Sequence, residues 1–383
     1  MSDLVPFDIQ TEIIKKLPIK SLIRFRSVSK PWKSLIDSSK FIHDNCLRNN
    51  QPHHLLVCYN LDSVLKYVSI MDDDSFPQHE FSPIVPVTLN RLRNAMKLGS
   101  SHGMICFYGL YPDIDNETKM VVLWNPTIRK SVGIVIPNVI YMPLGYIVIG
   151  FGVCPNTNDP KLIKITHINK SGSDEIINCV CWEAEVFTLS SGDWRSVSIE
   201  IPSKPVRLSW GQVFINGVIY WHGYDKIDVD EDDLYHRIIS FDLKSEEFGE
   251  LFLPDSLARF TGHMYVSKLM DSLVVIIESF EKPACDVWKM NDGVTKSWTK
   301  LYTVKASDSA IGISVLEFRK NGESIMEVEV DDYEEALLQV YEPYSGSVKD
   351  LRLNESKSLF ASCSVSSYKE TLALLHQSDS IIY

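Results

Sequence analysis

Two clusters of residues in this sequence carry groups that could bind a metal ion. Cys179 and Cys181 are one residue apart, which places both thiols on the same face of a strand, and acidic residues crowd the segment 225–233. Two thiols cannot complete a four-ligand zinc site, and no second cysteine pair with suitable spacing follows. The acidic segment begins like a calcium loop, but Asp233 stands where the sixth position requires glycine and Ile239 where the twelfth requires glutamate. We therefore expect no metal site and no cofactor, and an exposed acidic loop that could contact a basic partner.

Sequence patterns typical of enzymes are also missing. The chain has no G-x-S-x-G nucleophile motif, no G-x-x-x-x-G-K-[ST] phosphate loop and no paired G-x-G-x-x-G. Its ten histidines are scattered, and His53 and His54 form the only adjacent pair. An enzyme would need several polar or metal-binding side chains to converge at one place. We expect a non-catalytic protein.

Composition excludes several other classes of function. The chain has 383 residues, 45% of them hydrophobic, and a net charge of −12. This supports a real core and argues against a nucleic-acid-binding protein, which would need a basic face for phosphates. The apolar runs, such as 132–136 and 273–277, are as short as strands, so we expect no membrane span. The first residues do not resemble a signal peptide, which predicts a cytoplasmic or nuclear protein whose eight cysteines are reduced.

The first 45 or so residues have the apolar spacing of short helices. Ile9, Ile13 and Leu17 recur every four residues, which places them on one helix face. Pro18 ends this helix and begins a second, and Ser29 can cap a third over residues 30–36. Phe41 and Ile42 are expected to close the bundle. The sequence predicts three short helices.

A bundle of about 40 residues is too small to be stable by itself. Its apolar residues must therefore be covered, either by the rest of the same chain or by another protein.

The segment resembles the F-box, in the version found in large plant families. The resemblance is carried by Val5-Pro6, Asp8, Glu12-Ile13, Leu17-Pro18, Ser21-Leu22, Arg24-Phe25, Val28-Ser29-Lys30 and Trp32, with Val5 where the family usually has leucine. It implies binding to a Skp-type adaptor, and through it to a cullin and a RING protein. Some of the residues must form the bundle core instead. We expect the strongest anchors at Trp32 and the Leu17-Pro18 corner, within a predicted adaptor-binding set of Val5, Pro6, Ile9, Ile13, Leu17, Pro18, Leu22, Phe25, Val28 and Trp32.

From about residue 53 onward the sequence is rich in short strands. A strand with a central aromatic residue, a polar turn and a second strand recur with the aromatic residues at Trp124, Phe187, Phe241, Trp288 and Tyr341. Their spacing of about 50 residues matches a kelch-type blade. A second type of hairpin alternates with the first, and Asn216-Gly217 is a strong signal for a tight turn in one of them. Two hairpins per repeat predict a β-propeller of about six blades, with five or seven as alternatives, in which Trp124, Trp221 and Trp288 fill space between blades.

These strands resemble the kelch-related F-box-associated domain of plants. The matching motifs include Gly99 to Cys106, Leu123-Trp124-Asn125-Pro126, Gly150-Phe151-Gly152 and Ser297 to Leu301. We expect a helical F-box at 1–45, a connection with the first propeller strands at 46–95, and a substrate-binding propeller at 96–383. Residues 72–94 could be an extended connection rather than ordered strands.

By this resemblance, the chain is expected to be the substrate-recognition subunit of a Skp–cullin–F-box ubiquitin ligase that delivers an unknown protein target for degradation. Two alternatives are a non-degradative binding scaffold and a protein of the self-incompatibility type, whose targets are ribonucleases.

Overall fold

The computed structural model describes most of the chain, and its contacts divide the chain into two compact units. One unit contains Met1–Leu55, Ser69–Pro137 and Tyr368–Tyr383, and the other contains Leu56–Val68 and Asn138–Ser367. The boundaries that we predicted at residues 45 and 95 stay predictions. The structure describes residues 5–383 apart from 49–50, 62–63, 113–116, 138–145, 170–179, 200–205, 227–233, 280–281, 292, 294–295, 307–309, 331–334, 354–358, 361–362 and 378.

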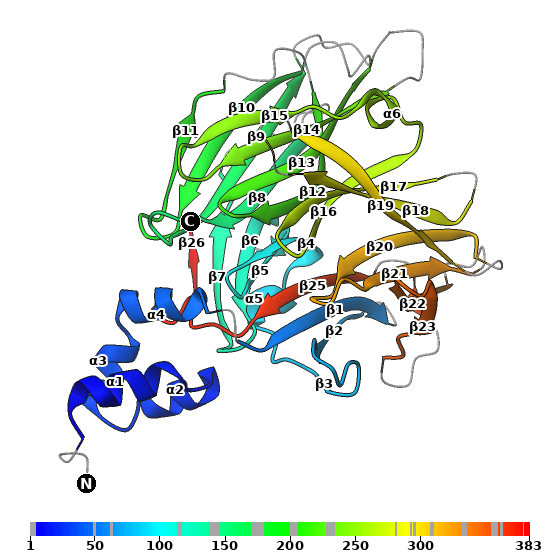
Figure 1. Cartoon of the computed structure of the whole chain (residues 1–383). Coiled ribbons are helices and arrows are strands. Elements are labelled where there is room, and N and C mark those ends of the chain that lie inside the picture. Colours follow the sequence, from blue (N-terminus) through cyan, green and yellow to red (C-terminus); the bar gives the residue numbers. More distant parts are fainter. Residues whose placement is uncertain are drawn as a thin grey trace. The chain divides into compact units, whose positions relative to one another are not determined.

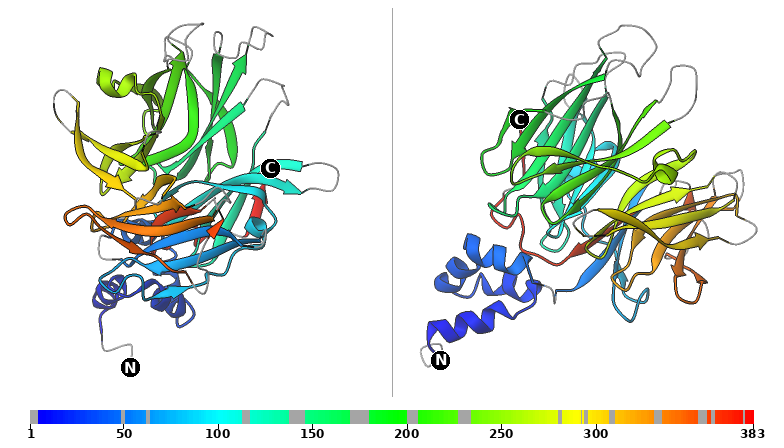
Figure 2. Two further views of the ribbon diagram at one scale, coloured as in Figure 1. Left: turned by 90° about the vertical axis from the view of Figure 1, so that its right-hand side faces the viewer. Right: turned by 45° about the horizontal axis from the view of Figure 1, so that its top comes forward.

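The N-terminal segment folds into four helices within its described residues, one more than predicted. Residues 39–46, which we expected only to close the bundle, form a helix of their own because the side chain of Ser38 accepts a hydrogen bond from the backbone of Phe41 and caps its first turn. Ser29 caps the preceding helix as predicted, by accepting from Trp32 N at 3.3 Å. The helices are α1 (Phe7–Lys15), α2 (Ile19–Phe25), α3 (Lys30–Ile36) and α4 (Ser39–Cys46), and they group together in each view (Figures 1 and 2).

The rest of the chain is a six-bladed β-propeller, as the sequence predicts. In the described part of the chain, each of the six sheets contains four strands, and two sheets gain a fifth strand, β24 and β26. The added strand β24 pairs antiparallel with β22, whereas β26 pairs in parallel with β7. Two short helices, α5 (Val87–Asn90) and α6 (Asp255–Ala258), lie between sheets in the sequence.

The first sheets take their strands from both ends of the propeller sequence. The order of one is β25 (Ser364–Lys369), β1 (His53–Leu61), β2 (Val64–Met71) and β3 (Glu80–Phe81). The order of the next is β26 (Ser380–Ile382), β7 (Lys130–Val135), β6 (Glu117–Asn125), β5 (Met104–Pro112) and β4 (Arg93–Ser101).

The four remaining sheets follow the sequence in order. They are β8 (Tyr146–Val153), β9 (Pro160–Asn169), β10 (Val180–Thr188) and β11 (Asp193–Val197); β12 (Arg207–Ile215), β13 (Val218–Lys226), β14 (Leu234–Asp242) and β15 (Glu247–Leu251); β16 (His263–Leu269), β17 (Ser272–Glu278), β18 (Ala284–Asn291) and β19 (Ser297–Lys305); and β20 (Gly312–Phe318), β21 (Ser324–Glu329), β22 (Glu335–Glu342) and β23 (Ser347–Asp350), where β24 (Leu359–Phe360) pairs with β22.

The repeated aromatic residues occupy equivalent places in the propeller. Trp124, Phe187, Phe241, Trp288 and Tyr341 all lie on the third strand of their sheets, so the repeat read from the sequence is the hairpin of the third and fourth strands. Trp124 and Trp221 are completely buried, and Trp288 is half-buried. Trp221 belongs to, and Trp288 packs against, a cluster that joins two sheets, which agrees with their predicted place between blades. Asn216 and Gly217 form the two-residue turn between β12 and β13, both with positive φ.

The segment from residue 72 to residue 94 is mostly a connection. Among its residues, only 80–81 (in β3) and 87–90 (α5) belong to short elements before β4 begins at Arg93. The alternative of an extended connection, left open by the sequence, therefore describes most of this segment.

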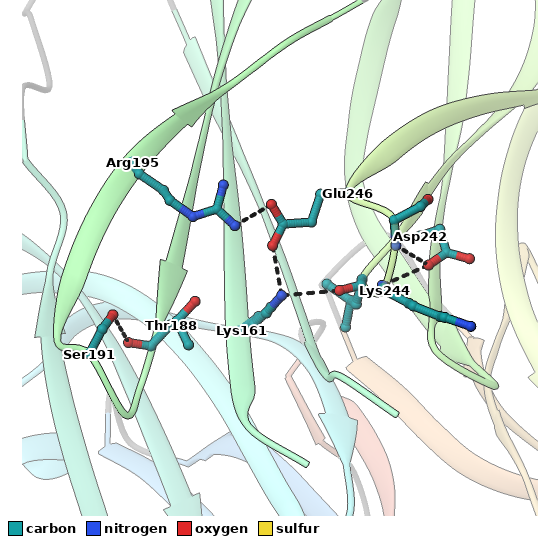
Figure 3. Close-up of polar contacts among 9 residues, drawn as sticks. Lys161, Thr188, Ser191, Arg195, Asp242, Lys244 and Glu246 are labelled. Carbon is teal, nitrogen blue, oxygen red and sulfur yellow. Dashed lines mark hydrogen bonds and ion pairs between the residues drawn. The ribbon is translucent and has the colours of Figure 1, made fainter. Parts of the chain in front are cut away.

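One polar network joins two neighbouring sheets of the second unit. Glu246, in the turn between β14 and β15, lies between Lys161 of β9 and Arg195 of β11 (Figure 3). Lys161 Nζ lies 2.7 Å from Glu246 Oε1 and also donates to the backbone oxygen of Leu243 at 3.1 Å. Burial disfavours the charged form of Glu246, but hydrogen bonds from both basic side chains outweigh it and lower the pKa of this carboxyl group.

Candidate functional site

The apolar core of the helical bundle contains residues from all four helices. Its completely or almost completely buried members are Ile14, Ile19, Leu22, Ile36 and Phe41. Leu22, which we predicted among the adaptor contacts, is 0% exposed and therefore belongs to this core. Sequence spacing could not separate the two roles, because it shows which residues share a helix face and not what covers that face. Ile14 and Ile19 were not predicted and are revealed by burial alone.

A second group of apolar side chains lies on the outside of the bundle. Ile9 and Ile13 are 53% and 55% exposed, and their spacing of four residues places them on one face of α1. Val5 and Val28 are 40% and 61% exposed, and Pro6 and Pro18 are exposed as well. Phe7, which we did not predict, is 46% exposed. So many exposed apolar groups on so small a bundle are typical of a protein interaction surface.

The remaining predicted contacts, Leu17, Phe25 and Trp32, are half-buried against the core. The rings of Phe25 and Trp32 meet edge to face, with centroids 5.2 Å apart, and Trp32 Nε1 donates to Gln10 Oε1 at 2.8 Å. Trp32 therefore ties α3 to α1 and α2. Trp32 as a main anchor of the adaptor stays a prediction, and its ring is half-buried against the bundle core.

An ion pair connects the ends of two helices. Arg26, which follows α2, donates to both carboxylate oxygens of Asp37, which follows α3, at 2.5 and 3.0 Å. Two-pronged contacts of this kind fix orientation as well as distance. Apolar packing and this ion pair thus stabilise the helices that carry the exposed side chains.

Residues near the other end of the sequence complete the bundle core. Leu372 and Leu375 belong to the same buried cluster as the helix residues, and Ile128 packs against it. Leu372 and Leu375 lie in the segment between β25 and β26, which passes α4 (Figure 1), whereas Ile128 lies between β6 and β7. Burial raises the pKa of the Cys46 thiol, at the end of α4, to about 11. The chain itself therefore covers part of the helical stripe, and the other part is exposed.

A buried chain of hydrogen bonds in the propeller was not predicted. His222 Nε2 lies 2.8 Å from His236 Nδ1, Ser209 Oγ lies 2.8 Å from His222 Nδ1, and His236 Nε2 lies 2.8 Å from the backbone oxygen of Phe260. Because a carbonyl oxygen only accepts, His236 Nε2 must donate, and the direction of the other two bonds follows from this. No sequence pattern indicates this contact, since the residues come from β12, β13 and β14 and meet only in the folded sheet.

This chain of hydrogen bonds links three strands and the backbone of Phe260, and it has a structural role. Burial and the neighbouring His236 lower the pKa of His222 to about 3, so its imidazole is neutral near pH 7 and a weak base toward Ser209. Within the described part of the chain, no group of three or more His, Cys, Asp or Glu side chains could hold a metal ion.

The other cysteine and acidic clusters can be placed only in part. The six cysteines in the described part of the chain are free thiols. Cys179 lies outside the described residues, as does the side chain of Cys181, and so does most of the acidic segment, residues 227–233. Among the helices described, none is long and apolar enough to cross a membrane.

Comparison with known families and proteins follows the same division of the chain. The F-box domain matches residues 3–44, and the F-box associated beta propeller domain matches residues 103–375. The putative F-box protein At1g47790 of Arabidopsis thaliana is 26% identical over 305 residues, which cover 77% of this chain and 70% of that protein. F-box protein CPR1 of Arabidopsis thaliana is 25% identical over 336 residues, covering 82% of this chain and 76% of that protein.

Among solved structures, the hemagglutinin-neuraminidase of parainfluenza virus 5 has a TM-score of 0.45 and 9% identity, and covers 72% of this chain and 83% of its own. A score below 0.5 supports no conclusion about this chain. The family matches do, since the propeller domain alone accounts for more than half of its length. With an F-box followed by this propeller, the chain belongs to the plant family of F-box proteins with an F-box-associated β-propeller domain.

Proposed function

We infer that this protein is the substrate-recognition subunit of a Skp–cullin–F-box ubiquitin ligase. The F-box implies binding to a Skp-type adaptor, which would connect the chain to a cullin and a RING protein. The observation that carries the proposal is that several apolar side chains of the F-box are exposed, above all those of Ile9 and Ile13 in α1. Large apolar side chains left in water on a small bundle are the anchors that a partner surface would bury.

In this role the protein contributes position and no chemistry. The propeller holds a target protein near a ubiquitin-charged conjugating enzyme, which raises the effective concentration of the target's lysines. The bond-forming groups belong to the conjugating enzyme. Loops carry the specificity of such scaffolds, so we assign target binding to the propeller loops. We propose that the complex works in the cytoplasm, the nucleus or both.

The test is binding of the purified full-length protein to a Skp-type adaptor, with Ile13→Asp as the variant. Ile84→Asp is a matched control, because Ile84 lies outside the F-box and is 56% exposed, against 55% for Ile13. We expect Ile13→Asp to weaken adaptor binding by about 2 kcal/mol, the usual loss at an anchor residue, and Ile84→Asp to bind like the wild type.

Circular dichroism should show that both variants keep the wild-type fold, since both side chains are exposed. A folded wild-type protein that does not bind the adaptor would overturn the proposal. A non-degradative binding scaffold would then be the better description of the protein.

A further inference from the structure

We propose that residues 368–383, here called the strap, position the adaptor-binding surface: the F-box holds its binding form only while the strap is docked on the sheet β4–β7. The positioning residues are Leu372 and Leu375. This inference rests on the proposed function and concerns its regulation. All the contacts that carry it lie within one compact unit of the chain.

The first step is that the F-box lacks a complete core of its own. Four helices of seven to nine residues lie in the size range where a single core is insufficient for stability. Leu372 is 0% exposed and Leu375 is 7% exposed, within the same cluster as Ile14, Leu22 and Phe41. The strap therefore supplies apolar contacts that the helices do not provide for each other.

The second step is that the sheet holds the strap by specific polar contacts. The buried side chain of Asn125 donates through Nδ2 to the backbone oxygens of Thr371 and Ala373 at 3.1 and 2.9 Å. Thr371 Oγ1 in turn donates to the backbone oxygen of His102 at 2.8 Å. The side chains of Asn125 and Thr371 are 0% exposed, so removal of one partner would leave a buried polar group without this hydrogen bond.

A glycine makes room for the same threonine. Gly103 has φ +79°, and a Cβ atom there would lie 2.3 Å from Thr371 Oγ1. Further along, β26 pairs with β7 in parallel, and Asp379 accepts a hydrogen bond from the backbone of Ser131 at 3.0 Å. The motifs around Gly103 and Asn125, which the sequence predicts as propeller strands, thus also bind the strap.

The third step is that the strap forms a strained turn between the two leucines that belong to the helical core. Leu374 has φ +66°, a conformation that bulky side chains rarely adopt, and the backbone of Leu375 donates to the oxygen of Leu372 across this turn. Strain of this kind persists only where the surroundings enforce it. The turn directs both leucines, Leu372 and Leu375, into the helical core.

The fourth step connects the strap with the exposed surface through a single helix. Ile14 of α1 is buried in the cluster that contains Leu372, while Ile9 and Ile13 of the same helix are exposed. A strap that leaves its place would remove two leucines from the cluster that holds Ile14, and we expect this to loosen α1 and with it the exposed side chains. By thermodynamic linkage, an adaptor that binds the ordered F-box must in return stabilise the docked strap.

The test compares Leu372→Ala with Leu273→Ala in the full-length protein. Both leucines are almost completely buried, but Leu273 lies in a propeller cluster that contains no strap residue. We expect Leu372→Ala to bind the Skp-type adaptor about tenfold more weakly, which corresponds to about 1.4 kcal/mol, and Leu273→Ala to keep wild-type affinity. Leu372→Met, which conserves volume, should restore most of the binding.

A second measurement needs no variant and covers the case in which Leu372→Ala fails to fold. Hydrogen exchange of the wild-type protein should slow in residues 368–377 when the adaptor is added, although the adaptor is expected on the exposed face of α1. Wild-type protein that binds the adaptor with unchanged exchange in the strap would overturn this inference and leave the proposed function intact. Wild-type protein that does not bind at all would overturn the proposed function instead.

Discussion

At the scale of single residues, burial decides the state of His222 and His236. Burial and then the charge of its neighbour lower the pKa of His222 to about 3, and burial lowers that of His236 as well. Both rings are needed in their neutral form, since each nitrogen in the chain from Ser209 to the backbone of Phe260 either donates or accepts. An added proton would break this order and place a charge in the core.

The first prediction is a loss of stability in mild acid. A histidine whose pKa is lowered by folding takes up its proton more readily in the unfolded chain, so its contribution is complete above pH 6.5 and is lost as the pH falls toward the folded value. For His222 this amounts to about 2 kcal/mol between pH 6.5 and 4.5.

Urea unfolding at several pH values should show this dependence, and His222→Gln should flatten it. The control is His79→Gln, because His79 is exposed. Equal pH profiles for the wild type and His222→Gln would contradict the assignment.

At the scale of elements, short turns fix the register of the propeller hairpins. The turn at Asn216-Gly217 has φ values of 49° and 90°, the conformation that joins two antiparallel strands with only two residues. The hairpin it closes aligns Val218 with Ile215, and the completely buried Trp221 lies on its second strand. Because side chains alternate across a strand, a slip of one residue would turn this tryptophan out of the core.

The second prediction concerns Gly217→Ala. A Cβ atom there would lie 2.8 Å from Pro155 Cγ, and alanine is strained at φ +90°. We expect a loss of about 1–3 kcal/mol in the free energy of unfolding. Gly211→Ala is the matched control, since its Cβ meets nothing within 4 Å, and it should change stability by less than about 0.5 kcal/mol. Chemical denaturation of the two variants measures the difference, and similar values for both would count against the turn argument.

At the scale of the whole molecule, apolar clusters join adjacent sheets within the second unit. One cluster joins the sheet β8–β11 to the sheet β12–β15 and contains Trp221 and Phe241. Another joins the sheet β16–β19 to the sheet β20–β23. The network of Glu246 with Lys161 and Arg195 adds a polar connection to the first of these pairs (Figure 3).

The third prediction compares the loss of both ion pairs of this network with the loss of the exposed one alone. Glu246→Gln breaks both pairs and leaves the ammonium group of Lys161, a side chain only 10% exposed, without its charged partner, and we expect a loss of roughly 1.5–3 kcal/mol in stability. Arg195 is 53% exposed, so Arg195→Gln should cost less than about 1 kcal/mol. Thermal and urea unfolding of both variants test this order. Equal losses would show that burial does not set the strength of these contacts.

The sequence by itself determined the class of the protein. Helical spacing in the first 45 residues, the aromatic repeat of about 50 residues and the turn at Asn216-Gly217 predicted short helices followed by a propeller of about six blades, because they depend on local periods and backbone preferences. The resemblance of the motifs between Val5 and Trp32 to a known family then identified the helices as an F-box. Only the tertiary structure decided which residues of the helical stripe are core and which are exposed. Leu22 and Ile13 look alike in the sequence, but one is completely buried and the other is 55% exposed.

The contacts of the strap could not be predicted from the sequence either. Asn125 and Thr371 lie 246 residues apart, and no local pattern indicates that they form hydrogen bonds. The same holds for Leu372 and the helices whose core it completes. Periodicity reports which neighbours along the chain share a face, whereas burial depends on which distant segment covers that face, and that is a property of the folded molecule alone.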